Sequence, residues 1–291
     1  MKIGKLLDLI CKDKPAFLKD NWVQGITARH LFMYSTIGNY IEASKKNNNF
    51  NLVEIGTWMG SSMLTWAHAL RTYNNATGNI LCIDPLIPYL NNKEDINTDN
   101  AVPIDSEHQE FYNEMQVLLE ENYVYEIWNH HRKLVSNSIN VSLFREKSSN
   151  ALPILESNKF DVVYIDGSHS YSSVLDDINQ AARITREGGI ICGDDLELQL
   201  HQCDQEFAIN NKDSDYIIEP KNNMFYHPGV TLAVGEYFGE VSSYAGFWVA
   251  RKKNDGFTQF DLPKIDYYVP EHFSGKVKEN YIKVIKPLFD N

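Results

Sequence analysis

Residues 51–84 read NLVEIGTWMGSSMLTWAHALRTYNNATGNILCID, and this stretch decides the fold. Its first five residues and residues 80–84 are short apolar runs that predict buried strands, and residues 61–73 between them predict a helix. Gly56 and Gly60 lie in the turn that joins the first strand to the helix. A strand, a helix and a second strand in this order form the unit from which parallel sheets are built.

The same alternation continues towards the C-terminus. Further strands are predicted at residues 141–145, 161–166 and 189–193, with helices at 28–46, 106–135, 151–157, 173–185 and 198–210. Residues 229–237 and 246–250 predict two more strands, paired antiparallel at one edge. We therefore expect an α/β protein with a Rossmann-like three-layer sandwich, built on a mostly parallel, seven-stranded sheet with an antiparallel edge strand.

Three parts are expected along the chain. They are an N-terminal helical cap at residues 1–49, a core at 50–253, and a tail at 254–291 that packs on the core or on a second subunit. Residues 86–105 are polar and carry Pro88 and Pro103, so they are expected to form an insertion in the core. The tail leaves a homo-oligomer open, because its aromatic side chains could cover either surface.

Composition excludes several classes of protein. The 291 residues include 27 Lys plus Arg and 39 Asp plus Glu, a net charge of −12, which argues against a nucleic-acid partner. Hydrophobic residues at 43% and charged residues at 23% are typical of a folded globular protein. No apolar run approaches the roughly 18 residues that span a bilayer, so no membrane partner is expected. The four cysteines are widely spaced, which indicates reduced thiols and a cytoplasmic location.

The ends of the first two strands predict a nucleoside-bearing cofactor. Gly56 and Gly60 allow the backbone to turn tightly beside a ligand, and Asp84 at the end of the second strand could accept hydrogen bonds from ribose hydroxyls. A dinucleotide fingerprint would need glycines where Trp58 and Ser61 stand, which argues against an NAD-dependent oxidoreductase or epimerase. The alternative is that the glycines serve only a tight turn and the aspartate only a loop.

The ends of the fourth and fifth strands predict a metal site. Asp166 ends one strand, and Asp194 and Asp195 end the next, so adjacent strands would bring three carboxylates together. Such a set of oxygen ligands suits Mg²⁺ or a similar divalent cation, although each aspartate could instead cap a helix. His169 lies three residues after Asp166 and could act as a general base. It could also be a loop histidine or a metal ligand.

Four segments resemble a known family when taken in order. VEIGTWMGSS, ILCIDP, DVVYIDGSHSY and GGIICGDD are similar to motifs of the class I S-adenosylmethionine-dependent methyltransferases, and among these to the metal-dependent O-methyltransferases. That group includes catechol O-methyltransferase, the macrocin type, and the cephalosporin-hydroxylase and rhamnosyl O-methyltransferase types. The resemblance covers roughly residues 50–250. It implies S-adenosylmethionine and Mg²⁺ as cofactors.

The resemblance also implies roles for individual residues. Glu54, Gly56 and Gly60 would contact the methionine part, Asp84 the ribose, and Lys147 and Ser148 the adenine edge, while Thr57, Ser61, Ser62 and Asp166 complete the cofactor site. Asp166, Asp194 and Asp195 would hold the metal. Asp166 and His169 are the expected catalytic residues, and His169 stands where the catechol enzymes place a lysine base.

The implied reaction is methyl transfer to a hydroxyl group of a small acceptor, such as a sugar or a glycoconjugate. The insertion at 86–105 and the N-terminal segment with Trp22, Gly25 and Thr27 could cover that acceptor, or could be surface packing. Two alternatives remain open: an NAD-dependent oxidoreductase or epimerase, and an S-adenosylmethionine-binding protein without transfer activity.

Overall fold

A computed structural model describes residues 8–17, 26–44, 49–87, 113, 115–137, 139–254 and 256–290. The strands are β1 (Asn51–Ile55), β2 (Asn79–Ile83), β3 (Asn140–Phe144), β4 (Phe160–Ile165), β5 (Thr185–Gly193), β6 (Ile217–Ile218), β7 (Phe225–Tyr226), β8 (Ser242–Tyr244), β9 (Phe247–Lys253) and β10 (Gly256–Gln259). The α-helices are α3 (Arg29–Ser44), α4 (Ser61–Tyr73), α6 (Tyr123–Val135), α7 (Ser148–Ala151), α8 (Tyr171–Ile184), α9 (Gln205–Asn210), α10 (Pro228–Phe238) and α11 (Gly275–Ile285). Short 3₁₀ helices lie at Leu152–Ile154, Leu200–Gln202 and Lys286–Leu288.

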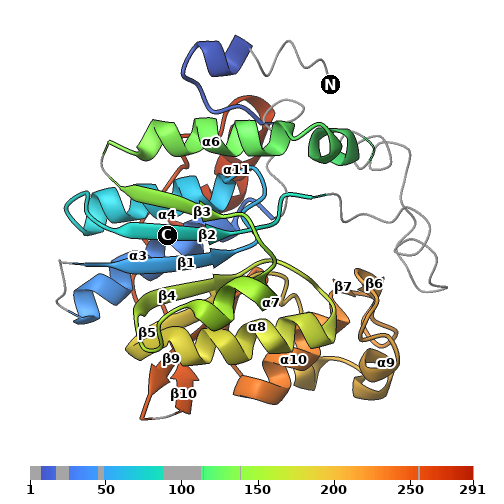
Figure 1. Cartoon of the computed structure of the whole chain (residues 1–291). Coiled ribbons are helices and arrows are strands. Elements are labelled where there is room, and N and C mark those ends of the chain that lie inside the picture. Colours follow the sequence, from blue (N-terminus) through green and yellow to red (C-terminus); the bar gives the residue numbers. More distant parts are fainter. Residues whose placement is uncertain are drawn as a thin grey trace.

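The larger sheet in the described part of the chain has eight strands. Seven of them follow the order β10-β9-β5-β4-β1-β2-β3, and β8 pairs with β9 (Figure 1). Strands β1 to β5 pair in parallel. Strand β9 pairs antiparallel with β5, and β8 and β10 each pair antiparallel with β9. The predicted fold class is confirmed, and the antiparallel edge is broader than expected. Because β2 and β4 flank β1, the strand order changes direction between β1 and β4, where open sheets bind their ligands.

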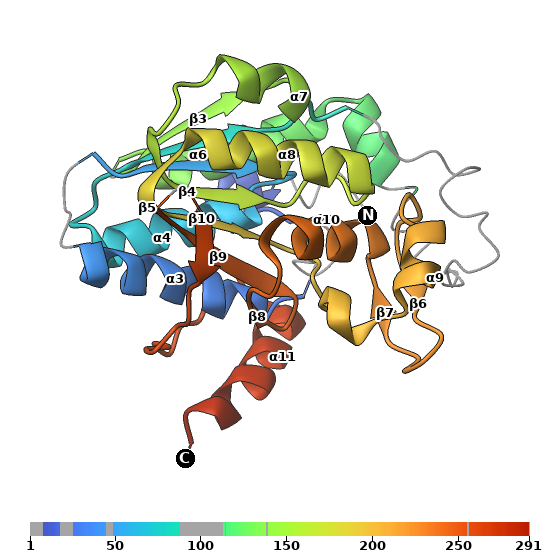
Figure 2. The same cartoon turned by 90° about the horizontal axis from the view of Figure 1, so that it is seen from below.

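Helices cover both faces of the sheet, and the alternation of side chains along each strand explains why. Helices α4 and α6 lie on one side of the sheet and α8 and α10 on the other (Figures 1 and 2). In β1, Leu52 packs with residues of α3, α4 and α6, while its neighbour Val53 packs with residues of α8 and α10. Both side chains are fully buried. Phe273 and Tyr281 of the C-terminal segment join the same cluster as Leu52. The tail therefore packs on this chain's own core.

The prediction of a strand at residues 229–237 is wrong, because these residues lie in helix α10. The run is apolar all round, so periodicity cannot distinguish a buried strand from a buried helix. Pro228 occupies the first helical turn, where its missing N–H group costs nothing. Every residue from Pro228 to Val234 is buried, and α10 packs beside α8 (Figure 2). Burial on every side accounts for the continuous apolar run.

Other predicted segments differ in detail. The helix predicted at 198–210 is a 3₁₀ turn followed by α9, and strands β6 and β7 form a separate small sheet. The expected insertion lies outside the described residues except for 86 and 87, as do Trp22 and Gly25, while Thr27 lies in a turn before α3. Among the described residues, no helix has the length and apolar character needed to cross a membrane.

Candidate functional site

Four neighbouring strands end in register at one edge of the sheet. Ile55 of β1 pairs with Ile83 of β2 and Ile165 of β4, and Ile165 pairs with Gly193 of β5. The residues that follow these strands form a row in the order Asp84, Gly56, Asp166 and Asp194. Backbone hydrogen bonds of 2.9 to 3.1 Å continue through this row. Since neighbouring strands lie about 4.8 Å apart, the glycine turn and the acidic groups are close neighbours.

The turn between β1 and α4 depends on glycine. Gly56 has a φ of +79°, and Gly60, which precedes α4, has a φ of +86°. A Cβ atom on Gly56 would lie 1.9 Å from the carbonyl oxygen of Asp166, so only glycine lets the turn pack against the end of β4. In the described structure no side chain caps α4 at Gly60. The first N–H groups of that helix are suited to a polar ligand.

Asp84 holds this turn in place. Its Oδ2 accepts hydrogen bonds from the backbone N–H groups of Thr57 and Trp58 at 3.0 and 2.9 Å, and Oδ1 accepts one from Leu86 at 2.8 Å. Burial raises the pKa of Asp84, and these three N–H groups limit the rise. A carboxylate has about four acceptor positions. Asp84 therefore has one position left for a further donor, fewer than the two ribose hydroxyls would need.

Glu54 supports the turn from beneath. Its side chain is completely buried, and its Oε2 accepts a hydrogen bond from Cys82 Sγ at 3.2 Å. Burial raises the pKa of Glu54, while hydrogen bonds from Ser62 and Thr57 act in the opposite direction. These contacts join β1, β2 and the first turn of α4. Ser62 is partly exposed, whereas the side chain of Glu54 has no solvent-accessible area.

The remaining predicted cofactor residues lie on both sides of the turn. Ser61 Oγ lies 2.9 Å from Nε2 of His272 in the C-terminal segment. Lys147 and Ser148 begin α7, which follows β3, the strand beside β2. Burial raises the pKa of Asp177 to about 6, and a hydrogen bond from Ser148 limits that rise. The structure thus places Ser148 against α8.

The structure brings Asp166, Asp194 and Asp195 together around a buried arginine. One ligand atom from each aspartate lies within 4.8 Å of the other two. Arg29, the first residue of α3, places Nη1 at 2.7 Å from Asp194 and 2.8 Å from Asp195, and Nη2 at 2.8 Å from Glu197. Its side chain is only 3% exposed. The guanidinium group therefore neutralises part of a buried acidic cluster.

Crowding changes the acidity of these carboxyl groups. Burial raises the pKa of Asp166 well above its ordinary value, and Asp194 and Asp195 raise it further. Burial and the neighbouring Asp195 also raise the pKa of Asp194, to about 7, against the effect of the arginine. For Asp195, burial is outweighed by the nearby cationic groups, above all His227 and His169, and its pKa lies well below the ordinary value. A further cation would stabilise the charged forms of Asp166 and Asp194.

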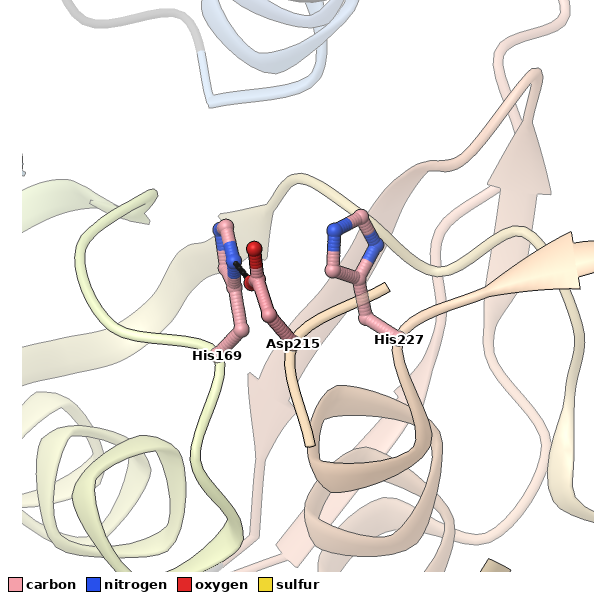
Figure 3. A group of neighbouring side chains, drawn as sticks. All are labelled: His169, Asp215 and His227. Atoms are coloured by element: carbon pink, nitrogen blue, oxygen red, sulfur yellow. Dashed lines mark hydrogen bonds and ion pairs between the residues drawn. The ribbon is translucent and has the colours of Figure 1, made fainter. Parts of the chain in front are cut away.

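His169 lies between two carboxylates. Its Nδ1 contacts Asp215, which precedes β6 (Figure 3). Its Nε2 lies 3.0 Å from Asp195 Oδ2. Burial alone would lower the pKa of His169, but the two carboxylates raise it well above its ordinary value. His227, at the start of α10, stands beside it with the ring centroids 4.4 Å apart. Its Nδ1 lies 3.1 Å from Glu197 Oε2.

Residues 53–196 match the family model of a methyltransferase domain. This segment runs from β1 to the residue after Asp195, so it includes the whole row of strand ends. Residues 53–196 form a methyltransferase domain. The predicted kinship with the methyltransferases is thereby confirmed.

The chain also has more distant similarity to other proteins. An uncharacterized protein of Acanthamoeba polyphaga mimivirus is 24% identical over 193 residues, which are 65% of this chain and 69% of that protein. Cofactor-bound Rv0187 of MTB shares 15% identity at a TM-score of 0.44, over 87% of this chain and 90% of its own. The Bacillus cereus O-methyltransferase in complex with SAH shares 14% at a TM-score of 0.40, over 86% and 90%. The assignment depends on the domain match.

Three residues around the acidic end of the methyltransferase domain escaped the sequence analysis: Arg29, Glu197 and Asp215. Arg29 is 166 positions from Asp195, so no local pattern links them. Glu197 follows Asp195 by two residues, and this spacing was the one available signal. Asp215 lies among residues 211–228, for which no helix or strand was predicted.

Acid should loosen the contact between the N-terminal segment and the glycine turn. His131 Nε2 accepts a hydrogen bond from the backbone N–H of Ala16 at 2.8 Å, so this nitrogen carries no proton and Nδ1 donates to Met59 O at 2.6 Å. Burial lowers the pKa of His131 from 6.5 to about 4. As the pH falls, the unfolded chain therefore binds a proton at His131 before the folded chain does. The contribution of neutral His131 to the free energy of unfolding is fully present above pH 6.5 and is smaller by about 2 kcal/mol at pH 5.

Urea unfolding at pH 7.5 and pH 5 measures this effect. We expect His131→Gln to be less stable than the parent at pH 7.5 and to lose less stability on acidification. His201→Gln, at an exposed position, is the control and should follow the parent. An equal pH dependence for His131→Gln and the parent would contradict the assignment of a neutral His131.

Proposed function

We propose that the protein is an S-adenosylmethionine-dependent O-methyltransferase that acts on a hydroxyl group of a small acceptor with the help of Mg²⁺. The observation that carries this proposal is the row of strand ends, which sets a glycine turn directly beside a cluster of aspartates. A sugar or glycoconjugate acceptor is proposed from the motif resemblance. The four free thiols and the net charge of −12 support a cytoplasmic enzyme without a nucleic-acid partner.

The glycine turn fits S-adenosylmethionine. Gly56 and Gly60 bring backbone rather than side chains to the ligand, and the uncapped start of α4 offers N–H groups. Trp58 occupies the place of a middle glycine, where a pyrophosphate would need close backbone approach. Asp84 keeps the turn rigid through Thr57 and Trp58 and retains one acceptor position. When bound, S-adenosylmethionine supplies the electrophilic methyl group.

The aspartate cluster fits a divalent cation. Asp166, Asp194 and Asp195 offer oxygen ligands that lie within 4.8 Å of one another. Burial and the two neighbouring carboxylates raise the pKa of Asp166, so a bound cation would stabilise its charged form. Arg29 already balances part of the charge of Asp194 and Asp195. When bound, Mg²⁺ would favour ionisation of the acceptor hydroxyl.

His169 is the proposed proton acceptor, and Asp215 positions it. The contact between His169 Nδ1 and Asp215 orients the ring, and Nε2 faces the aspartate cluster. Because its Nε2 lies 3.0 Å from Asp195 Oδ2 and the two carboxylates raise its pKa, His169 carries a proton on both ring nitrogens, so it must release the Nε2 proton before it can take one from the acceptor. The protein's main contribution would be to hold acceptor and methyl donor aligned in a site closed to water.

Calorimetric titration of the metal-stripped protein with S-adenosylhomocysteine, and separately with Mg²⁺, tests the two halves of this site. Asp84→Ala should weaken S-adenosylhomocysteine by at least about tenfold, because the turn loses its clamp, and leave Mg²⁺ binding unchanged. Asp194→Asn should weaken Mg²⁺ by at least about tenfold and leave S-adenosylhomocysteine unchanged. Asp194→Asn should also abolish methyl transfer in an acceptor screen.

Three outcomes decide the proposal. Binding of neither S-adenosylhomocysteine nor Mg²⁺ by the parent would overturn it, and tight binding of NADH would favour an oxidoreductase. Binding of S-adenosylhomocysteine without transfer to any hydroxylated acceptor would favour a binding protein. Asp213→Asn, an exposed change outside the site, should leave both titrations unaltered.

A further inference from the structure

Beside the aspartate cluster lies a second group of metal-ligand side chains. His169 comes from the loop between β4 and α8, Asp215 from the segment before β6, and His227 from the start of α10. One ligand atom from each lies within 4.8 Å of the others (Figure 3). Around a tetrahedral ion with bonds of about 2.1 Å, such atoms would lie about 3.4 Å apart. Small side-chain rotations would therefore bring all three to one ion.

Both histidine rings are oriented as metal-binding histidines usually are. A ligating histidine binds the ion through one nitrogen and donates the N–H of the other to a carboxylate. His169 Nε2 lies 3.0 Å from Asp195, and His227 Nδ1 lies 3.1 Å from Glu197. The opposite nitrogen of His169 meets Asp215, and a ring nitrogen of His227 faces the same place (Figure 3).

Arg29 also pairs with the two outer carboxylates, those of Asp195 and Glu197. Its Nη1 lies 2.8 Å from Asp195 and its Nη2 lies 2.8 Å from Glu197, so both remain partners of the histidines rather than competing ligands. Asp215 is 52% exposed, which leaves a path for an ion and room for a water ligand. His227 is 10% exposed and closes the opposite side.

We propose that His169, Asp215 and His227 bind a transition-metal ion of the Zn²⁺ class at a site distinct from the three-aspartate site. Two imidazole nitrogens and one carboxylate oxygen suit Zn²⁺ or Co²⁺ rather than Mg²⁺, which takes oxygen ligands. An ion here engages His169 and removes it as a proton acceptor. This last consequence, inhibition of methyl transfer, rests on the proposed function; binding of the ion does not.

Titration of the metal-stripped full chain with Co²⁺ in excess Mg²⁺, followed by the visible absorption of nitrogen-bound Co²⁺, tests the site. We expect one Co²⁺ per chain, displaced by Zn²⁺. Asp215→Asn, a change at an exposed position, should weaken Co²⁺ by at least about tenfold, and His227→Gln should remove the absorption. Asp213→Asn is the matched control two residues away and should bind Co²⁺ as the parent does.

A further variant distinguishes the proposed Co²⁺ site from the three-aspartate site. Asp194→Asn should keep the Co²⁺ absorption while losing affinity for Mg²⁺. Absence of Co²⁺ binding in the parent, equal binding in the parent and Asp215→Asn, or loss of the absorption only in Asp194→Asn would overturn the proposal. Titration of each variant with S-adenosylhomocysteine tests the proposed function separately. If His227→Gln fails to fold, the Co²⁺ affinity of Asp215→Asn tests the metal site.

Discussion

Gly56→Ala should destabilise the protein by more than about 4 kcal/mol, whereas Gly188→Ala should cost about 1–2 kcal/mol. Both glycines have positive φ, +79° and +74°. At Gly56 a Cβ atom would lie 1.9 Å from the carbonyl oxygen of Asp166, while at Gly188 the nearest atom is the end of Arg251 at 3.7 Å. The backbone strain is shared by the two variants, so their difference isolates the clash between the turn and β4.

Urea unfolding of both variants measures this difference. A shift of the turn away from β4 would also disturb the row of strand ends, so any folded Gly56→Ala should bind S-adenosylhomocysteine at least about tenfold more weakly. Gly188 lies inside β5, five residues before the strand ends at Gly193 beside the site, and Gly188→Ala should bind normally. Equal stability of the two variants would contradict the close approach of the turn to Asp166.

Arg29→Met should lower the free energy of unfolding by about 3–5 kcal/mol, because it leaves buried carboxylates without their cation. The guanidinium group contacts Asp194, Asp195 and Glu197 and donates from Nε to Ala245 O at 2.8 Å. Methionine keeps much of the volume but none of these contacts. The remaining negative charge should also raise the pKa of Asp194 above about 7, since Arg29 now lowers it.

Two comparisons make this result specific. Arg71 pairs with Glu271 at 2.9 Å near the surface, where both side chains are at least 31% exposed, so Arg71→Met should cost less than about 1 kcal/mol. The double variant Arg29→Met/Asp194→Asn should lose less stability than the two single changes added together. Equal losses for Arg29→Met and Arg71→Met would show that Arg29 does not compensate the buried cluster.

Much of the candidate site followed from local patterns. Four of the five parallel strands were apolar runs ending at Gly56, Asp84, Asp166 or Asp194, and parallel strands in one sheet end at the same edge. These motifs therefore predicted that the glycines and aspartates lie at one edge of the sheet, whereas their order along that edge came from the pairing of the strands. Residues 229–237 could not be assigned in this way, because burial on all sides removes the periodicity that separates a helix from a strand.

Local sequence patterns indicated the parallel strands, most of the helices between them, and the acidic and glycine residues at the strand ends, because these depend on neighbours along the chain. Only the tertiary structure decided which charges balance the aspartates. Arg29 and Asp195 are 166 positions apart in the sequence. His227 stands directly before α10, a helix whose residues had been predicted as a strand. Electrostatic interaction depends on distance through space, and these distances exist only after the chain folds.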